Sequence, residues 1–140
     1  MLKNSRTFRI EWGDCDSAGI VFYPRYFAMF DHSTSMLISA ASGLTKFQLL
    51  QQHESAGYPM VDTRAKFYKP CRYGDDVTIE SEFTKVGKSS FEVHHRLMKD
   101  GEMALEGFET RVWVGKDPDD PNKIKAKPIP EDLAARFRAG

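Results

Sequence analysis

One long apolar stripe at helical spacing sets the main constraint on the fold of this chain. Its members, which recur at about 100° per residue, are Phe27, Phe30, Thr34, Leu37, Ile38 and Ala41. Pro24 suits the first helical turn, because its fixed φ is helical and it has no N–H to leave unpaired. Gly43 is placed to end the helix. We therefore predict a largely buried helix over about Pro24–Ser42, which the rest of the chain must cover.

Alternating apolar and polar residues mark five segments as β-strands with one buried face. In Thr7–Trp12, the first of them, the apolar positions are Phe8, Ile10 and Trp12. In each of the next three runs one face is shared by Val61, Thr63, Ala65 and Phe67; by Val77, Ile79 and Phe83; and by Phe91, Val93 and Leu97. In the last run Met103 and Leu105 are in phase with each other but out of phase with Phe108, Val112 and Val114. The last set changes phase at Gly107, which predicts a β-bulge there.

Turn signals and two short helices complete the predicted layout. Asp100-Gly101 is a strong hairpin signal, and Asp117–Pro121 has the composition of a loop. A short helix is expected over Thr45–Gln52, with Thr45 as its cap, and another over Glu131–Ala139. The order is then a strand, the long helix and an antiparallel meander of four strands. We predict an α+β fold in a single domain over residues 1–140, with a curved sheet wrapped around the helix.

Charge and composition argue against several classes of function. The 20 basic residues balance the 20 acidic ones, which gives no support to a general affinity for nucleic acid or an anionic membrane. The first residues lack the apolar run of a signal peptide, and no stretch approaches the roughly 20 apolar residues of a membrane span. Cys15 and Cys71 are too few for a disulfide framework. We expect a cytoplasmic protein with no nucleic-acid or membrane partner.

The segment between the first strand and the long helix is rich in acids and glycines. Asp14, Asp16 and Gly19 occupy the first, third and sixth positions of a calcium loop. However, Ala18 and Arg25 stand where an EF-hand needs an oxygen ligand and a bidentate glutamate, so we reject a calcium site.

Two readings remain open for Asp14 and Asp16. Both acids can accept hydrogen bonds from local backbone N–H groups in Asx-type turns. Alternatively, one acid acts on a ligand at the start of the long helix. Tyr23 has no short side-chain acceptor to cap the first turn, so the N–H groups of that turn and the positive end of the helix dipole are free to polarise a carbonyl, on which the acid could then act. A nucleophilic role for Cys15 is disfavoured, because the neighbouring acids oppose thiolate formation.

Residues Trp12–Tyr26, WGDCDSAGIVFYPRY, closely resemble the signature segment of the hot dog-fold acyl-CoA thioesterases, specifically the 4-hydroxybenzoyl-CoA thioesterase branch. The acid pair, a glycine and two tyrosines are in register, and a weaker resemblance continues to the C-terminal region. It implies a hot dog fold, in which a five-stranded antiparallel sheet wraps around one long central helix. It also implies a thioester hydrolase that needs no cofactor or metal, takes an acyl-CoA substrate and works as a homo-oligomer, a dimer of dimers.

The same resemblance implies roles for individual residues. Asp16 matches the catalytic carboxylate, and the backbone N–H of Tyr23 matches the group that binds the thioester oxygen. A carboxylate can attack a thioester carbonyl directly, giving an anhydride that water opens, or it can activate water as a general base. The sequence leaves both routes open.

Asp31 is an acid at the margin of the apolar stripe, where an acid is unexpected. It is either a helix acid with one exposed edge or, by the resemblance, the group that meets the phenolic hydroxyl of an aromatic acyl group. The resemblance also matches Lys88 and Lys125 to basic residues that contact the phosphates of coenzyme A, often from different subunits. A solvated lysine run is the alternative for these two.

Two further predictions concern a metal site and the class of function. His94 and His95 are adjacent on a strand, so they point to opposite faces and cannot chelate one metal together. A non-catalytic CoA- or acyl-binding protein on the same fold is the competing class. Among enzymes, a 4-hydroxybenzoyl-type aromatic acyl group is favoured, and a short aliphatic one is the runner-up.

Overall fold

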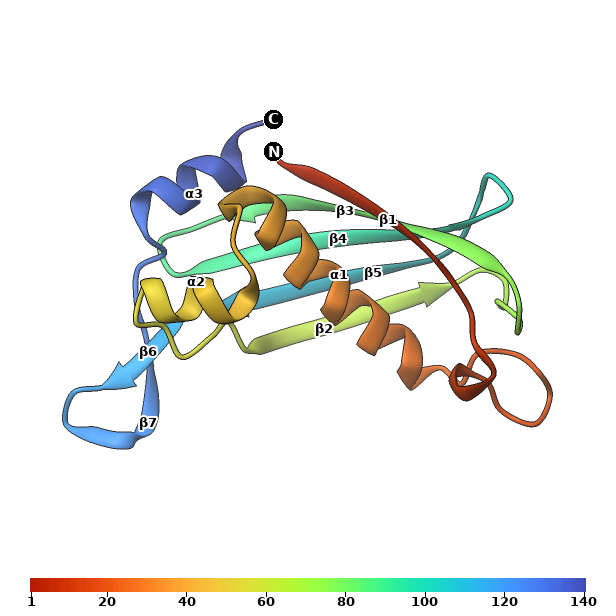
Figure 1. Ribbon diagram of the computed structural model, residues 1–140, viewed down its shortest axis with the longest axis horizontal. Coiled ribbons are helices and arrows are strands. Elements are labelled where there is room, and N and C mark those ends of the chain that lie inside the picture. The colour runs from red at the N-terminus through yellow and green to blue at the C-terminus, as the bar shows by residue number, and fades with distance from the viewer.

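The computed structural model, which describes residues 1–140, contains one antiparallel sheet crossed by a long helix (Figure 1). The sheet has the strand order β1-β3-β4-β5-β2, and its strands are β1 (Lys3–Arg9), β2 (Met60–Phe67), β3 (Asp76–Val86), β4 (Ser90–Lys99) and β5 (Glu102–Val112). A separate hairpin pairs β6 (Val114–Asp117) with β7 (Asp120–Ala126). The helices are η1 (Trp12–Asp14, a 3-10 helix), α1 (Pro24–Ser42), α2 (Lys46–Gln52) and α3 (Glu131–Arg138). The α+β class and the five-stranded antiparallel sheet are confirmed.

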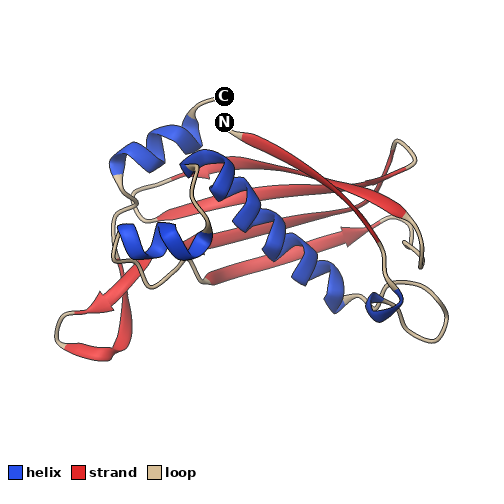
Figure 2. Ribbon diagram, viewed as in Figure 1, coloured by secondary structure: helices blue, strands red, loops and turns tan.

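Local sequence signals bound two of the helices that Figure 2 draws in blue, α1 and α2. Gly43 ends α1 at φ +73°, a left-handed conformation that suits glycine, and its N–H donates to the carbonyl of Ser39 at 2.8 Å. Thr45 caps α2 by accepting from the N–H of Gln48, whose side chain in turn accepts from the N–H of Thr45. None of the helices has the length and apolar character that crossing a bilayer requires.

The strand predictions need three corrections. β1 ends at Arg9 and does not reach Trp12. Ile10 is still buried, but Trp12 lies in η1 and is 58% exposed. The meander covers only β3, β4 and β5, because β2 pairs with β5 at the far edge of the sheet. The segment predicted to be a loop, Asp117–Pro121, forms the turn and first residues of the β6–β7 hairpin. Alternation reports which residues face inward, but it carries no information about which strand lies beside which.

Gly107 does not form the bulge that its phase change predicts. The register shift in β5 lies at Ala104, between the pairs Leu97–Leu105 and Met98–Met103. Gly107 is instead a regular ladder residue, and a Cβ built on it lies 2.6 Å from Cε2 of Phe30. The glycine is needed because α1 presses the ring of Phe30 against the sheet at this position.

We expect Gly107→Ala to lower the free energy of unfolding by about 2 kcal/mol, because Phe30 is fully buried and cannot move aside without strain. Gly13→Ala is the matched control, since nothing lies within 4 Å of a Cβ at Gly13. Urea unfolding of both variants measures the difference. Equal stability of the two would contradict a packing role for Gly107.

A layer of buried polar residues divides the interior into two apolar clusters. One cluster gathers around Phe83, Phe91 and Phe137, and the other around Phe30 and Leu105. Between them lie Thr34 from α1, Ser81 from β3, His95 from β4, and Glu109 and Arg111 from β5. Because the charged pair of β5 faces inward, Phe108 and Val112 are only partly buried on the other face, and the prediction that they face the core is wrong.

Candidate active site

The acid-rich segment folds into a closed loop between β1 and α1. Cys15 forms an antiparallel bridge with Val21, and the N–H of Asp16 donates to the carbonyl of Ile20 at 3.0 Å. Gly19 turns the loop at φ +78°. The N–H of Val21 donates to the carbonyl of Cys71 at 2.9 Å, which ties the loop to the chain just before β3. The loop therefore holds Asp16 in a defined position at one end of the sheet.

Asp14 is a structural acid. One carboxylate oxygen accepts from the N–H of Glu11 at 3.0 Å, and the other pairs with the Arg25 guanidinium at 3.0 Å. Its charge also acts on Cys15: burial raises the pKa of this thiol, and the charges of Asp14 and Asp16 raise it further. The thiolate is therefore disfavoured, as the sequence predicts.

Asp16 is exposed and only half engaged. Its Oδ1 accepts from the N–H of Ala18 at 2.8 Å, which is an Asx-type turn. Its Oδ2 makes no hydrogen bond within the chain. The Asx-type turn thus accounts for one carboxylate oxygen of Asp16, and the other oxygen is free to act on a ligand.

The first turn of α1 presents a free backbone donor at Tyr23. This residue is the N-cap, at φ −53° and ψ −36°, and no side chain caps the helix. The N–H of Arg25 donates to the carbonyl of Phe22 at 2.8 Å, and Pro24 has no N–H. The N–H of Tyr23 has no partner within the chain, so it lies unpaired at the positive end of the helix dipole. Such a group can polarise a carbonyl oxygen.

Asp31 lies eight positions after Tyr23 in α1, which is about 12 Å along the helix axis. It lines a cavity of about 670 Å³ together with Ser35 and Met36 of α1 and residues that lead into α2. Its side chain is 56% exposed, and its Oδ1 accepts from Nη2 of Arg111 at 2.7 Å. Asp31 is thus a partly exposed acid that is also anchored to the sheet.

Arg111 belongs to the buried polar layer. Its Nε donates to Glu109 Oε1 at 2.8 Å, and the same oxygen accepts from the Thr34 hydroxyl at 2.5 Å. Burial alone raises the pKa of Glu109, but hydrogen bonds from His95 and Arg111 outweigh burial and hold the pKa below its usual value. Burial lowers the pKa of Arg111, and the ion pairs with Glu109 and Asp31 more than compensate. Both groups therefore stay charged near neutral pH.

The two histidines of β4 face opposite sides of the sheet, as predicted. His95 is fully buried, and its Nε2 lies 3.0 Å from the Thr34 hydroxyl. Because that hydroxyl spends its hydrogen on Glu109, Nε2 must be the donor, and Nδ1 lies 2.7 Å from the Ser81 hydroxyl. His94 lies on the other face and stacks on Phe108 with ring centroids 4.7 Å apart.

Lys88 and Lys125 do not lie near Asp16. Lys88 is in the turn after β3, whereas the acid loop follows β1 at the start of β3. The eleven residues of β3 separate these ends by roughly 35 Å. Lys125 is exposed on β7, which lies at the same end as the β3–β4 turn (Figure 1). Within one chain the structure brings Asp16 and Tyr23 to one loop and leaves both lysines at the opposite end.

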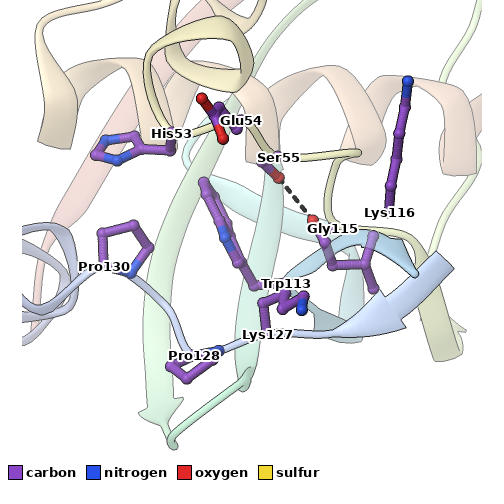
Figure 3. Close-up of a pocket in the computed structure, with 10 residues that line it drawn as sticks. His53, Glu54, Ser55, Trp113, Gly115, Lys116, Lys127, Pro128 and Pro130 are labelled. Carbon is purple, nitrogen blue, oxygen red and sulfur yellow. Dashed lines mark hydrogen bonds between the residues drawn. The ribbon is translucent and has the colours of Figure 1, made fainter. Parts of the chain in front are cut away.

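A second cavity, of about 640 Å³, lies between the segment after α2, the start of β6 and the segment before α3 (Figure 3). His53, Trp113, Lys116, Lys127 and neighbouring prolines line it. Ser55 holds one wall in place by donating to the carbonyl of Val114 at 2.9 Å. This cavity is lined by none of Asp16, Tyr23 and Asp31, so we do not assign the reaction to it.

Sequence reasoning missed Glu109 and Arg111. The available signal was their spacing: both continue the inward phase of Leu105 and Gly107 along β5. Two opposite charges two residues apart on one strand share a face, and on an inward face they require each other as partners. Because both residues are charged, hydropathy alone predicts that their face of β5 is exposed to solvent.

Comparison with known proteins identifies the family. A sequence model of the thioesterase-like superfamily matches residues 10–137. The 4-hydroxybenzoyl-CoA thioesterase of Pseudomonas sp. (strain CBS-3) is 30% identical over 130 residues, covering 89% of each chain. Its solved structure has a TM-score of 0.88 and covers 97% of this chain and 99% of its own.

Two further relatives agree with this match. A 1,4-dihydroxy-2-naphthoyl-CoA hydrolase of Prochlorococcus marinus is 28% identical and covers 89% of this chain and 82% of its own. A solved gentisyl-coenzyme A thioesterase is 28% identical, has a TM-score of 0.81 and covers 97% of this chain and all of its own. The chain therefore belongs to the thioesterase-like superfamily and is an acyl-CoA thioesterase with the hot dog fold.

Proposed function

We propose that this enzyme hydrolyses the thioester of an aromatic acyl-CoA, such as 4-hydroxybenzoyl-CoA, to the free acid and CoA. The observation that carries the proposal is that a free Asp16 carboxylate oxygen and the unpaired Tyr23 N–H both lie in the segment that joins β1 to α1. The first group supplies a base or nucleophile, and the second supplies a donor for the thioester oxygen. No metal or cofactor is needed for either step.

The chemistry follows two routes from the same geometry. As a nucleophile, Asp16 Oδ2 adds to the acyl carbon, the C–S bond breaks, CoA leaves as its thiolate, and water then opens the anhydride. As a general base, Asp16 takes a proton from water, which adds to the acyl carbon before the thiolate leaves. In both routes negative charge develops on the carbonyl oxygen, where the Tyr23 N–H stabilises it at the helix terminus.

The preference for an aromatic acyl group rests on Asp31. A 4-hydroxybenzoyl group with one hydrogen bond at each end spans about the 12 Å that separate Tyr23 from Asp31 along α1. A carboxylate at that distance can accept a hydrogen bond from a phenolic hydroxyl. The compared relatives support this choice, because the acyl groups in their names, 4-hydroxybenzoyl, gentisyl and 1,4-dihydroxy-2-naphthoyl, are all hydroxylated aromatic acids.

We further propose that the enzyme is a homo-oligomer, a dimer of dimers. Lys88 and Lys125 lie at the opposite end of the sheet from the acid loop, so phosphates held by these lysines in one subunit belong to a thioester that reacts in another. The edge strand β2 supports association, because its outer edge is unpaired and it exposes apolar side chains, namely Met60, Val61 and Phe67. The proposed site is therefore shared between subunits.

A panel of acyl-CoA thioesters, assayed for released thiol, tests the proposed function. We expect kcat/KM to be higher for 4-hydroxybenzoyl-CoA than for benzoyl-CoA or short aliphatic acyl-CoAs. Asp31→Ala should lower kcat/KM for the hydroxylated substrate about 10-fold or more beyond its effect on benzoyl-CoA, because a hydrogen bond to a charged group is lost. Asp119→Ala, which removes an acid from an exposed turn, is the control.

Each result of this panel has a defined meaning. If Asp31→Ala affected both benzoyl substrates equally, the role of Asp31 in recognising the hydroxyl would be rejected. Preference for short aliphatic thioesters would replace the aromatic assignment. Tight binding without turnover of any thioester would point to a binding protein instead of an enzyme.

A further inference from the structure

Arg111 is the one side chain that connects Asp31 to the buried interior. It is 4% exposed, and each of its three nitrogens has a partner. Nη2 donates to Asp31 Oδ1 at 2.7 Å, Nε donates to Glu109 Oε1 at 2.8 Å, and Nη1 donates to the carbonyl of Tyr58 at 3.3 Å. The flat guanidinium is held on all sides, so the acid it grips cannot turn freely.

Glu109 fixes the arginine in turn. Its side chain is 1% exposed and it accepts from Thr34 of α1, while His95 Nε2 lies 3.4 Å from its Oε2. Ser81 of β3 closes the chain of contacts through His95. The polar layer therefore joins α1 to three neighbouring strands. Asp31, at one end of this network, is its one exposed member.

Tyr58 adds a second support next to the same cavity. Its hydroxyl lies 3.0 Å from that of Ser35, which lines the cavity beside Asp31. Its carbonyl accepts from Arg111, and its ring lies 5.7 Å from the guanidinium carbon. Arg111 also lines a neighbouring depression with Tyr58 and Lys46, and Lys46 lines the Asp31 cavity as well. The ion pair thus stands between two adjoining hollows.

We propose that Arg111 is a positioning residue that sets substrate choice: with Glu109 behind it, it fixes Oδ1 of Asp31 so that Oδ2 faces the acyl hydroxyl. This inference rests on the proposed function. An exposed carboxylate on its own samples several rotamers, and ordering it on binding costs free energy. A carboxylate already held by a buried guanidinium avoids that cost, so its second oxygen is positioned in advance to accept from a hydroxyl donor.

Arg111→Lys is the decisive variant. It keeps a positive charge beside Glu109, but a single ammonium lacks the fork that holds Glu109 and Asp31 at once. We expect the ratio of kcat/KM for 4-hydroxybenzoyl-CoA to that for benzoyl-CoA to fall about 5-fold or more. Arg111→Gln should lower the ratio at least as far. Arg96→Lys, which alters an ion pair with Glu82 on the other sheet face, is the matched control and should keep the parent ratio.

A structural role alone predicts a different pattern. If Arg111 only stabilised the fold, both substrates would lose activity by the same factor and the ratio would not change, which would overturn the proposal. The double variant Asp31→Ala/Arg111→Lys should have the ratio of Asp31→Ala alone, because Arg111 acts through Asp31. A further drop in the double variant would show that Arg111 acts on the substrate independently, and would also overturn the proposal.

The parent enzyme separates failure of this inference from failure of the proposed function. A parent that does not favour the hydroxylated substrate refutes the substrate assignment, and the positioning role with it. A parent that favours it, together with Arg111 variants that keep the parent ratio, refutes the positioning role only. Should Arg111→Gln not fold because Glu109 is left unpaired, Arg111→Lys alone decides.

Discussion

Asp16→Asn is expected to lower kcat for thioester hydrolysis by about 10²–10⁴-fold while leaving acyl-CoA binding within a few-fold of the parent. Asparagine keeps the shape of the side chain, and its amide oxygen can still accept from the Ala18 N–H that holds Oδ1 of the parent. The change removes the charge that both proposed routes require. Steady-state kinetics and binding of the intact thioester to the variant, measured by calorimetry, give the two quantities.

Asp14→Asn is the matched control for Asp16. Asp14 uses one oxygen on the Glu11 N–H and the other on Arg25, so its charge serves the fold. We expect less than a 10-fold change in kcat, with a loss of stability of about 0.5–1 kcal/mol from the weakened ion pair. If Asp14→Asn and Asp16→Asn lost the same activity, the division of labour between the two acids would be wrong. Full activity of Asp16→Asn would remove Asp16 from the mechanism.

The parts of the fold that follow from local sequence were predictable. Pro24 and Gly43 bound α1, and the Thr45 cap begins α2, because a cap acts on residues three or four positions away. The Asp100-Gly101 hairpin holds for the same reason, since both residues have positive φ in the turn. The position of β2 beside β5 was not predictable, because pairing depends on contacts between segments more than 30 residues apart in sequence.

In the candidate site, too, the features that could be predicted join residues that are close in sequence. The acid loop and the Tyr23 N–H are close in sequence, so the motif and the helix start could be recognised together. The Asp31–Arg111 ion pair joins residues 80 positions apart, and nothing in a single sequence announces it. Buried charges also reverse the hydropathy rule, which explains why Glu109 was placed on the wrong face of β5.

The N–H of Tyr23 can be removed by a substitution that fits the φ of this residue. Phe22 to Arg25 form a turn closed by the Arg25 N–H at 2.8 Å, with Tyr23 at its second position. The φ of −53° at Tyr23 is one that proline adopts, and proline is favoured at the second position of such a turn. Tyr23→Pro therefore deletes the donor at a φ that the parent turn already has.

We expect Tyr23→Pro to lower kcat by about 10²–10³-fold, the usual effect of losing one oxyanion donor. Tyr23→Ala is its control, because it removes the exposed ring but keeps the N–H, and it should cost no more than about 10-fold. Circular dichroism and thermal unfolding show whether both variants keep the fold, and steady-state kinetics on the preferred thioester give kcat. Equal losses in the two variants would assign the effect to the tyrosine ring. A large loss in Tyr23→Pro alone would leave the backbone N–H as the cause, since the two variants share the missing ring and differ in the donor.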